Sequence, residues 1–235
     1  MAESFVLDAA TWRVQDLSAS LAFYQRLGFR VLRVDAQRAE LVPAGDARPA
    51  APPVLRLEAD PVASVAPGRG AYHLAFLLPT RRVLAAAVRR LAHDEAPLAG
   101  FADHLVSEAV YLQDTDGHGL EFSWDLPRGT VLGHVHLFVA DVAADARWYR
   151  DALGLAEVVG FGPWGTFLAA DGYHHHVGLR RGVGVTDPDR DQGLVEVSAR
   201  LAAERYAALA AAEVEGAKTV AAPSGHRWRL RPLTA

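Results

Sequence analysis

Hydrophobic and polar positions follow the same order in two separate stretches of the chain. An apolar, strand-like segment is followed by an Asp that can cap a helix, then by an aromatic pair on that helix, then by a Gly suited to its C-terminal end. These positions are Asp16, Phe23, Tyr24 and Gly28 in one copy, and Asp141, Trp148, Tyr149 and Gly154 in the other. Further strand-like segments follow each helix, so both copies are predicted to be βαβββ units.

A second pair of units is fainter. Apolar strands near residues 70–76 and 193–199 lead into Ala-rich segments that predict helices near residues 80–93 and 201–213. In their last strands, Gly117 and Gly225 precede Glu121 and Arg229 by the same four positions. Repetition of this kind has to be recognised before a fold is assigned. The sequence therefore predicts an α+β protein of four βαβββ units, with an N-terminal half at residues 1–125 and a C-terminal half, whose last unit is degenerate, at residues 131–235.

Composition narrows the class of protein. The chain has 235 residues, of which 51% are hydrophobic and 22% charged, enough for a substantial core. Its net charge of −4 gives no electrostatic footprint for nucleic acid. The absence of cysteine excludes disulfides and thiolate metal sites and fits a reducing compartment. With neither a signal peptide nor a membrane span in the pattern, we expect a cytoplasmic protein.

Aligning the four units places chemically distinctive residues at matching positions. The opening strands carry Ala9, His73, His134 and Glu196, and the last strands of units two, three and four carry Glu121, Gly178 and Arg229. Pairing units one with two, or three with four, gives no sound metal site, because Ala has no donor and a cation cannot ligate a cation. Pairing units two and three gives His73, His134 and Glu121. Two imidazoles and one carboxylate form the facial triad of non-haem Fe(II) oxygenases, so we predict a crossed pairing: units two with three, and one with four.

Five segments carry a resemblance to a known family: GHVHL at 133–137, YHLA at 72–75, DHLVSE at 103–108, DGHGLE at 116–121 and GYHHH at 172–176. They resemble the vicinal-oxygen-chelate superfamily of glyoxalases, bleomycin-resistance proteins and extradiol dioxygenases. The closest similarity is to catechol 2,3-dioxygenase-like members. The resemblance implies two eight-stranded, cup-like half-barrels and a divalent metal, Fe(II) first and Mn(II) or another ion second.

Three further residues are expected near the metal. Tyr111 and Glu121 are nearly symmetric about the turn at residues 114–117, which predicts cross-strand neighbours on one face. The resemblance implies that Tyr111 and His104 contact the bound ring and that His175 has an acid–base role toward dioxygen.

The other histidines are expected to divide between the cup, the packing and the surface. Strand alternation predicts that His136 shares a face with His134, and that His174 and His176 face away from His175. His93, His118 and His226, which lie near helix ends or turns, are expected to be solvated.

Three functions are weighed. The first is an extradiol ring-cleaving dioxygenase acting on a catechol or hydroquinone-like aromatic, with O₂ as co-substrate. The second is another metalloenzyme of the family, such as a glyoxalase-like lyase or isomerase, which usually needs a fourth protein ligand. The third is a non-catalytic protein that binds an aromatic compound or antibiotic. The expected partners are small molecules only, with neither nucleic acid nor membrane, and a homodimer is left open.

The pairing of units one and four predicts a decayed second site. Its ligand positions hold Ala9, Glu196 and Arg229. A carboxylate or a guanidinium buried alone is costly, so Glu196 and Arg229 are predicted to pair across this cup, with the guanidinium standing in for the lost metal.

Overall fold

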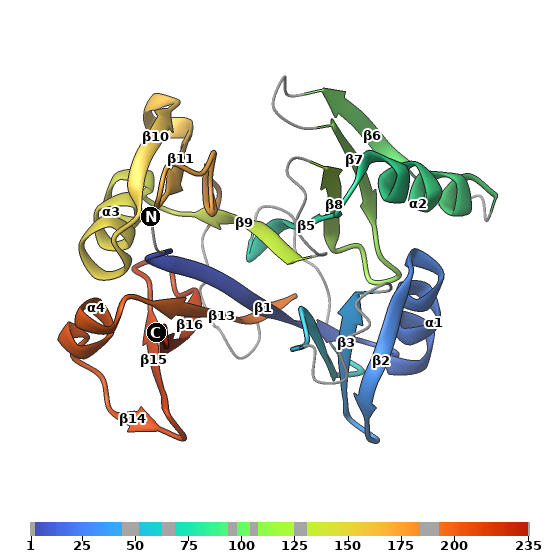
Figure 1. Ribbon diagram of the computed structural model, residues 1–235, viewed down its shortest axis with the longest axis horizontal. Helices are drawn as coiled ribbons and strands as arrows, with labels where there is room; N and C mark the ends of the chain where they lie inside the picture. Colours follow the sequence, from blue (N-terminus) through green and yellow to red (C-terminus); the bar gives the residue numbers. More distant parts are fainter. Residues whose placement is uncertain are drawn as a thin grey trace.

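The computed structural model describes residues 3–43, 52–62, 69–93, 98–103, 108–124, 131–183 and 193–234. All four predicted βαβββ units are present (Figure 1). Unit one comprises β1 (Phe5–Val14), α1 (Leu17–Leu27), β2 (Phe29–Val34), β3 (Arg38–Pro43) and β4 (Leu55–Ala59). Unit two comprises β5 (Ala71–Leu77), α2 (Arg81–His93), β6 (Leu98–Asp103), β7 (Glu108–Gln113) and β8 (Gly119–Trp124).

The C-terminal units repeat this order. Unit three comprises β9 (Val131–Val139), α3 (Val142–Trp148) with a π-helical extension (Tyr149–Leu153), β10 (Ala156–Gly160), a 3-10 turn (Gly162–Trp164), β11 (Gly165–Ala169) and β12 (Val177–Arg181). Unit four comprises β13 (Leu194–Leu201), α4 (Ala203–Ala208), β14 (Glu213–Val214), β15 (Ala217–Ala221) and β16 (Arg227–Pro232). The division into halves stays a prediction, because residues 125–130 lie outside the described residues.

The predicted helix boundaries follow from local chemistry. The carboxylates of Asp16 and Asp141 each accept a hydrogen bond, at 3.0 Å, from the backbone N–H three residues ahead, which satisfies a donor that the first helical turn leaves free. Gly28 and Gly154 follow the helical segments with φ of 102° and 77°, a left-handed conformation that favours glycine. The repeated Asp and Gly therefore fix where these helical segments begin and end.

The strands form two eight-stranded sheets whose pairing is crossed, as the ligand positions predicted. One sheet combines units one and four in the order β14-β15-β16-β13-β1-β4-β3-β2, and the other combines units two and three in the order β10-β11-β12-β9-β5-β8-β7-β6. In each sheet the two opening strands pair antiparallel at the centre, and each has the last strand of its own unit as its parallel outer neighbour. The α+β architecture of cup-like halves is confirmed.

Aromatic side chains from the helical segments are buried in the core. Tyr24 and Tyr149, the second members of the two aromatic pairs, are fully buried. The Tyr24 hydroxyl donates to Asp114 at 2.8 Å, and Trp228 Nε1–H donates to the Tyr149 hydroxyl at 3.1 Å. Buried Tyr and Trp need such partners for their polar atoms, so these bonds attach α1 and the π-helical segment to the sheets.

The predicted helix at residues 201–213 is wrong in its second half, because α4 ends at Ala208. The ammonium of Lys218, on β15, donates to the carbonyl oxygens of Tyr206 and Leu209 at 3.0 and 2.8 Å. These contacts satisfy carbonyl groups that a longer helix would have used itself. A tertiary contact therefore overrides the helix propensity of the alanine-rich segment.

The prediction that His118 and His226 are solvated is also wrong, since each is only 3% exposed. His118 stacks on Trp12 with ring centroids 4.3 Å apart, and His226 Nε2–H donates to the carbonyl oxygen of Phe138 at 2.9 Å. Both histidines therefore contact a strand of the opposite sheet. Burial lowers the pKa of His226 to about 4.

Among the described helices, none is long and apolar enough to cross a membrane.

Candidate metal centre

Three buried side chains from three strands converge on one point. His73 comes from β5, His134 from β9 and Glu121 from β8, and they are 6%, 3% and 3% exposed. His73 Nε2 lies 3.1 Å from His134 Nε2 and 3.2 Å from Glu121 Oε2, and His134 Nε2 lies 3.3 Å from the same oxygen. The structure therefore brings together the three residues that sequence alignment selected.

The strand register explains the convergence. Ala75 on β5 pairs with His134 on one side and with Glu121 on the other. Paired residues share a face of the sheet, and His73 lies two positions from Ala75 on the same face. All three side chains therefore enter one concave surface, the histidine cup, which we define as the face of the β5–β9 sheet that carries them.

The electrostatics of the cup favour an ionised carboxylate beside the imidazoles. Burial alone would raise the pKa of Glu121, but the charges and hydrogen bonds of His134 and His73 outweigh it and hold this pKa well below the usual range. Atoms bound to one ion at about 2.1 Å lie about 3 Å apart in neighbouring octahedral positions. The donor set and its spacing therefore fit a divalent metal ion.

The fourth position of the cup offers no protein ligand. Gly178 on β12 pairs with His136 on β9, and a Cβ atom added at Gly178 would lie 2.9 Å from the His136 ring. The imidazole therefore fills the space that a side chain at residue 178 would need. His136 shares the face of His134, as alternation predicted, and burial lowers its pKa well below the usual value.

Tyr111 lies where the hairpin symmetry predicted. It pairs directly with Glu121 across β7 and β8, and its ring centroid is 5.7 Å from that of His73. Burial raises the pKa of Tyr111, and the charge of Glu121 raises it further, so its hydroxyl stays protonated at neutral pH. His104 lies outside the described residues.

His175 borders the cup beside His134. The two ring centroids are 4.0 Å apart, and the His175 ring also stacks on that of Phe167, with centroids 4.3 Å apart and planes 12° from parallel. Burial lowers the pKa of His175, so its imidazole is neutral at neutral pH. Sequence reasoning missed Phe167, because its place beside the cup follows from its pairing with Gly178, a register that no local pattern reveals.

The predicted alternation of the three consecutive histidines is wrong. His174 and His175 both lie near His134, with possible ligand atoms within 4.8 Å of one another. Strand β12 begins only at Val177, and the chain turns at Asp171 and Gly172, both with positive φ. Residues 174–176 therefore precede the strand and do not follow its two-residue period. The Asp-Gly pair was the available signal for this turn.

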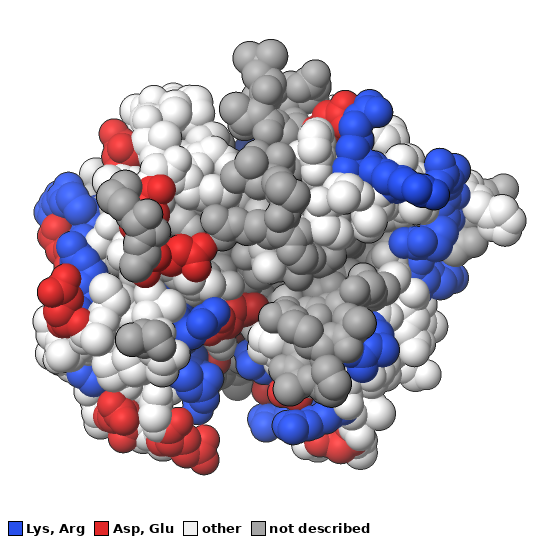
Figure 2. Space-filling model, viewed as in Figure 1, with Lys and Arg blue, Asp and Glu red and all other residues white. Residues whose placement is uncertain are grey.

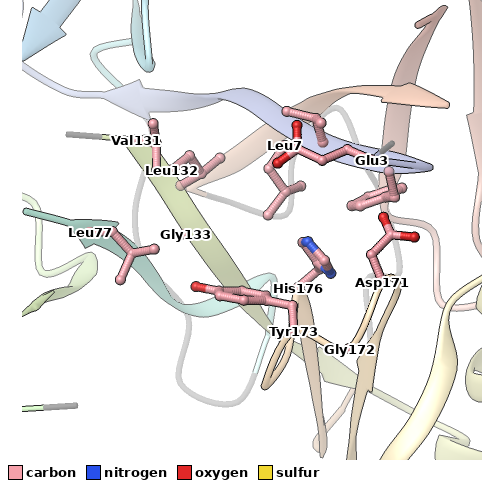
Figure 3. Close-up of a pocket in the computed structure, with 12 residues that line it drawn as sticks. Glu3, Leu7, Leu77, Val131, Leu132, Gly133, Asp171, Gly172, Tyr173 and His176 are labelled. Carbon is pink, nitrogen blue, oxygen red and sulfur yellow. The ribbon is translucent and has the colours of Figure 1, made fainter. Parts of the chain in front are cut away.

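The third histidine packs elsewhere. His176 borders a separate cavity of about 340 Å³ on the β1 side of the turn, together with Phe5 and Tyr173 (Figure 3). Its ring meets that of Phe5 edge-on, with centroids 5.1 Å apart. His176 is therefore a packing residue between the sheets and lies outside the histidine cup.

Comparisons with known proteins agree with this architecture. The family model described as Glyoxalase/Bleomycin resistance protein/Dioxygenase superfamily matches residues 6–122 and 131–231. A curated relative, catechol-2,3-dioxygenase of Bacillus subtilis (strain 168), is 34% identical, with 75% of each chain covered.

Solved structures share the fold. A Bacillus subtilis protein provisionally described as a dioxygenase superimposes with a TM-score of 0.73 at 13% identity, covering 99% of this chain and 86% of its own. Glyoxalase I from Zea mays gives a TM-score of 0.64 at 16% identity, covering 97% and 92%. At these identities the likeness concerns the fold alone. Together with the match of the family model to both halves, it means that the chain belongs to the Glyoxalase/Bleomycin resistance protein/Dioxygenase superfamily, also called the vicinal-oxygen-chelate superfamily.

Proposed function

We propose that the histidine cup is the active site of an extradiol-type dioxygenase that cleaves a catechol or hydroquinone-like ring. His73, His134 and Glu121 would hold the metal, with Fe(II) as the first choice and Mn(II) as the second. The observation that carries the proposal is the three-residue donor set with a glycine at the fourth position. Such a set leaves coordination positions open for substrate and O₂. The 34% identity with the catechol-2,3-dioxygenase supports the same choice.

The residues around the triad suit this chemistry. Held by His73, His134 and Glu121, the ion would supply Lewis-acid chemistry to the ring oxygens and redox chemistry toward O₂. His175, which lies beside His134 at the border of the cup, would have the acid–base role toward dioxygen that the resemblance implies. Tyr111, whose hydroxyl stays protonated, would donate a hydrogen bond to a ring oxygen. For His104 the proposed contact with the substrate rests on the resemblance alone.

The glyoxalase-like alternative is disfavoured by one contact. That chemistry usually uses a fourth protein ligand, and Gly178 supplies none. The His136 ring also occupies the space that a larger residue would need. The non-catalytic alternative is disfavoured by the burial of a carboxylate against two imidazoles, an arrangement that a protein binding only aromatic compounds would not need.

Compartment and assembly complete the proposal. We place the enzyme in the cytoplasm, because the chain has no cysteine. Homodimer formation stays a prediction that light scattering can check.

The experiment is anaerobic loading with Fe(II), followed by addition of catechol and air. We expect one bound ion per chain, O₂ uptake equal to the catechol consumed, and absorbance from a ring-opened product. Metal binding with isomerase or lyase activity and no O₂ uptake would support the glyoxalase-like alternative. Binding of an aromatic compound by metal-free protein, with no turnover after loading, would support the non-catalytic one.

A further inference from the structure

The sheet of units one and four repeats the layout of the histidine cup. Thr11 on β1 pairs with both Glu196 and Arg56, as Ala75 pairs with His134 and Glu121. Ser198 on β13 pairs with both Ala9 and Arg229, as His136 pairs with His73 and Gly178. The four positions that hold His73, Glu121, His134 and Gly178 in one sheet therefore hold Ala9, Arg56, Glu196 and Arg229 in the other. We call this second surface the arginine cup.

The predicted direct pair in this cup is wrong. Arg229 Nη2 lies 3.4 Å from Glu215 Oε2, and no ion pair joins Arg229 to Glu196. Both side chains are only half-buried and border an open cavity, so neither needs the other for solvation. Burial raises the pKa of Glu196, and the charges of Arg229 and Arg56 offset part of that rise.

The cavity of the arginine cup is large and balanced in charge. Its volume is about 690 Å³, within the range of small-molecule sites. Five arginines and five acidic residues line it, against three apolar residues. In Figure 2 the hollow at the lower edge of the molecule is bordered by side chains of both signs. A cavity of this composition favours a ligand that itself carries both charges.

The charged groups divide into a rim, where opposite charges pair with one another, and a floor. At the rim, Arg38 lies 3.3 Å from Glu58. On the floor, Arg56 donates to Ser198 Oγ at 3.2 Å and lies 3.5 Å from Glu40, which orients its guanidinium.

Two floor groups remain open to a ligand. The partner of Arg229, Glu215, is 82% exposed, so this pair is weak and leaves the guanidinium available. Among the described residues, Glu196 has no ion-pair partner within 4.0 Å, although Arg56 and Arg229 influence it electrostatically.

We propose that the arginine cup binds a small zwitterion with one carboxylate and one ammonium group, such as an α-amino acid. The carboxylate would lie against Arg229 and Arg56, since guanidinium groups match carboxylates in geometry and charge. The ammonium would lie against Glu196. A ligand with only a carboxylate would face the repulsion of Glu196, and one with only an ammonium would face that of the two arginines.

The test is calorimetric titration of the full chain with three matched probes. L-serine carries both groups, 3-hydroxypropionate lacks the ammonium, and ethanolamine lacks the carboxylate. We expect L-serine to bind and each truncated probe to bind at least tenfold more weakly. Arg229→Gln and Glu196→Gln should each weaken L-serine binding at least tenfold, whereas Arg147→Gln and Glu204→Gln, matched changes at exposed helix positions, should not.

Metal content of the histidine cup and the circular dichroism spectrum report whether each variant is folded, and Arg56→Gln replaces any variant that is not. Three results would overturn the proposal: no L-serine binding up to about 10 mM, equal binding by wild type and cup variants, or tighter binding of 3-hydroxypropionate than of L-serine. None of these readouts depends on ring cleavage, so the proposal can fail while the proposed function stands.

Discussion

The two cups of this molecule have the same pairing of strands but different side chains at the matching positions. Matching register positions hold His73, Glu121 and His134 in one sheet and Ala9, Arg56 and Glu196 in the other. The first set is almost fully buried and its donor atoms lie 3.1–3.3 Å apart. The second set surrounds an open cavity of about 690 Å³ in which charges are spread out.

The difference shows that the strand register determines which residues face the cup, whereas the side chains of those residues determine what the cup can bind. Imidazole and carboxylate donors can share an ion, so they tolerate burial together. Guanidinium groups cannot share one, and in the arginine cup Arg56 and Arg229 are part-exposed and lie near separate carboxylates. The fold alone would predict a metal site in both cups, but only the histidine cup has a donor set that fits a metal ion.

The largest expected effect is the loss of metal from Glu121→Ala. Removing the carboxylate leaves two imidazoles and no charge to offset that of the ion, so we expect metal affinity to fall more than 100-fold and ring cleavage to be lost. Metal analysis after gel filtration measures this, with Glu204→Ala as the matched control. Full metal content and wild-type turnover in the Glu121 variant would remove Glu121 from the ligand set.

The second effect concerns pH and His226, the buried histidine that contacts β9 of the opposite sheet. The pKa of His226 is about 4 in the folded chain, below the ordinary value of 6.5. Between pH 4 and pH 6.5 the unfolded chain binds more protons than the folded chain, so the free energy of unfolding rises with pH. As the pH falls below 6.5, this contribution of His226 to stability is progressively lost, and the loss reaches roughly 3 kcal/mol at pH 4.

His226→Gln keeps a donor for the Phe138 carbonyl but cannot titrate. We expect urea unfolding between pH 7 and pH 4 to show a smaller decline for this variant than for wild type. Identical pH profiles would mean that His226 is not protonated on unfolding in this range.

The third effect concerns residue 178, which occupies the fourth ligand position of the histidine cup. In Gly178→Glu the new Cβ atom would lie 2.9 Å from the His136 ring, so we expect a loss of roughly 1–3 kcal/mol in stability. Adding His136→Ala should recover part of that loss and let the new carboxylate approach the metal. Thermal unfolding of both variants, with and without Mn(II), measures this. If Gly178→Glu alone is as stable as wild type, His136 does not block the position.

The smallest effect is expected at the rim of the arginine cup. Arg38 and Glu58 form an exposed pair at 3.3 Å, and such pairs contribute about 0–1 kcal/mol. Arg38→Gln should therefore change the free energy of unfolding by less than about 1 kcal/mol and leave metal binding intact. A larger loss, measured by urea unfolding, would mean that the rim pairs organise this sheet.

Much of the fold could be predicted from the sequence, because the repeated positions define the units and the chemistry of their ligand positions selects how the units pair. The repeated Asp and Gly positions set the helical segments, and the requirement for compatible ligands selected the crossed pairing of units. His73, His134 and Glu121 could be chosen without coordinates, since matching positions in repeated units must occupy matching places in the sheets.

What escaped prediction depends on contacts between distant segments. Lys218 ends α4 early by binding its carbonyl groups. His226 is buried because its turn meets a strand of the other sheet. Phe167 lies beside His175 through the pairing of β11 with β12. None of these leaves a periodic mark in the local sequence.

The central claim is that one cup holds a metal and the other does not. Anomalous diffraction from crystals grown with Mn(II) tests it directly. The account predicts one peak per chain, about 2.0–2.3 Å from His73 Nε2, His134 Nε2 and a carboxylate oxygen of Glu121, and none between Arg56, Glu196 and Arg229. A peak in the arginine cup, or no peak beside the three predicted ligands, would contradict it.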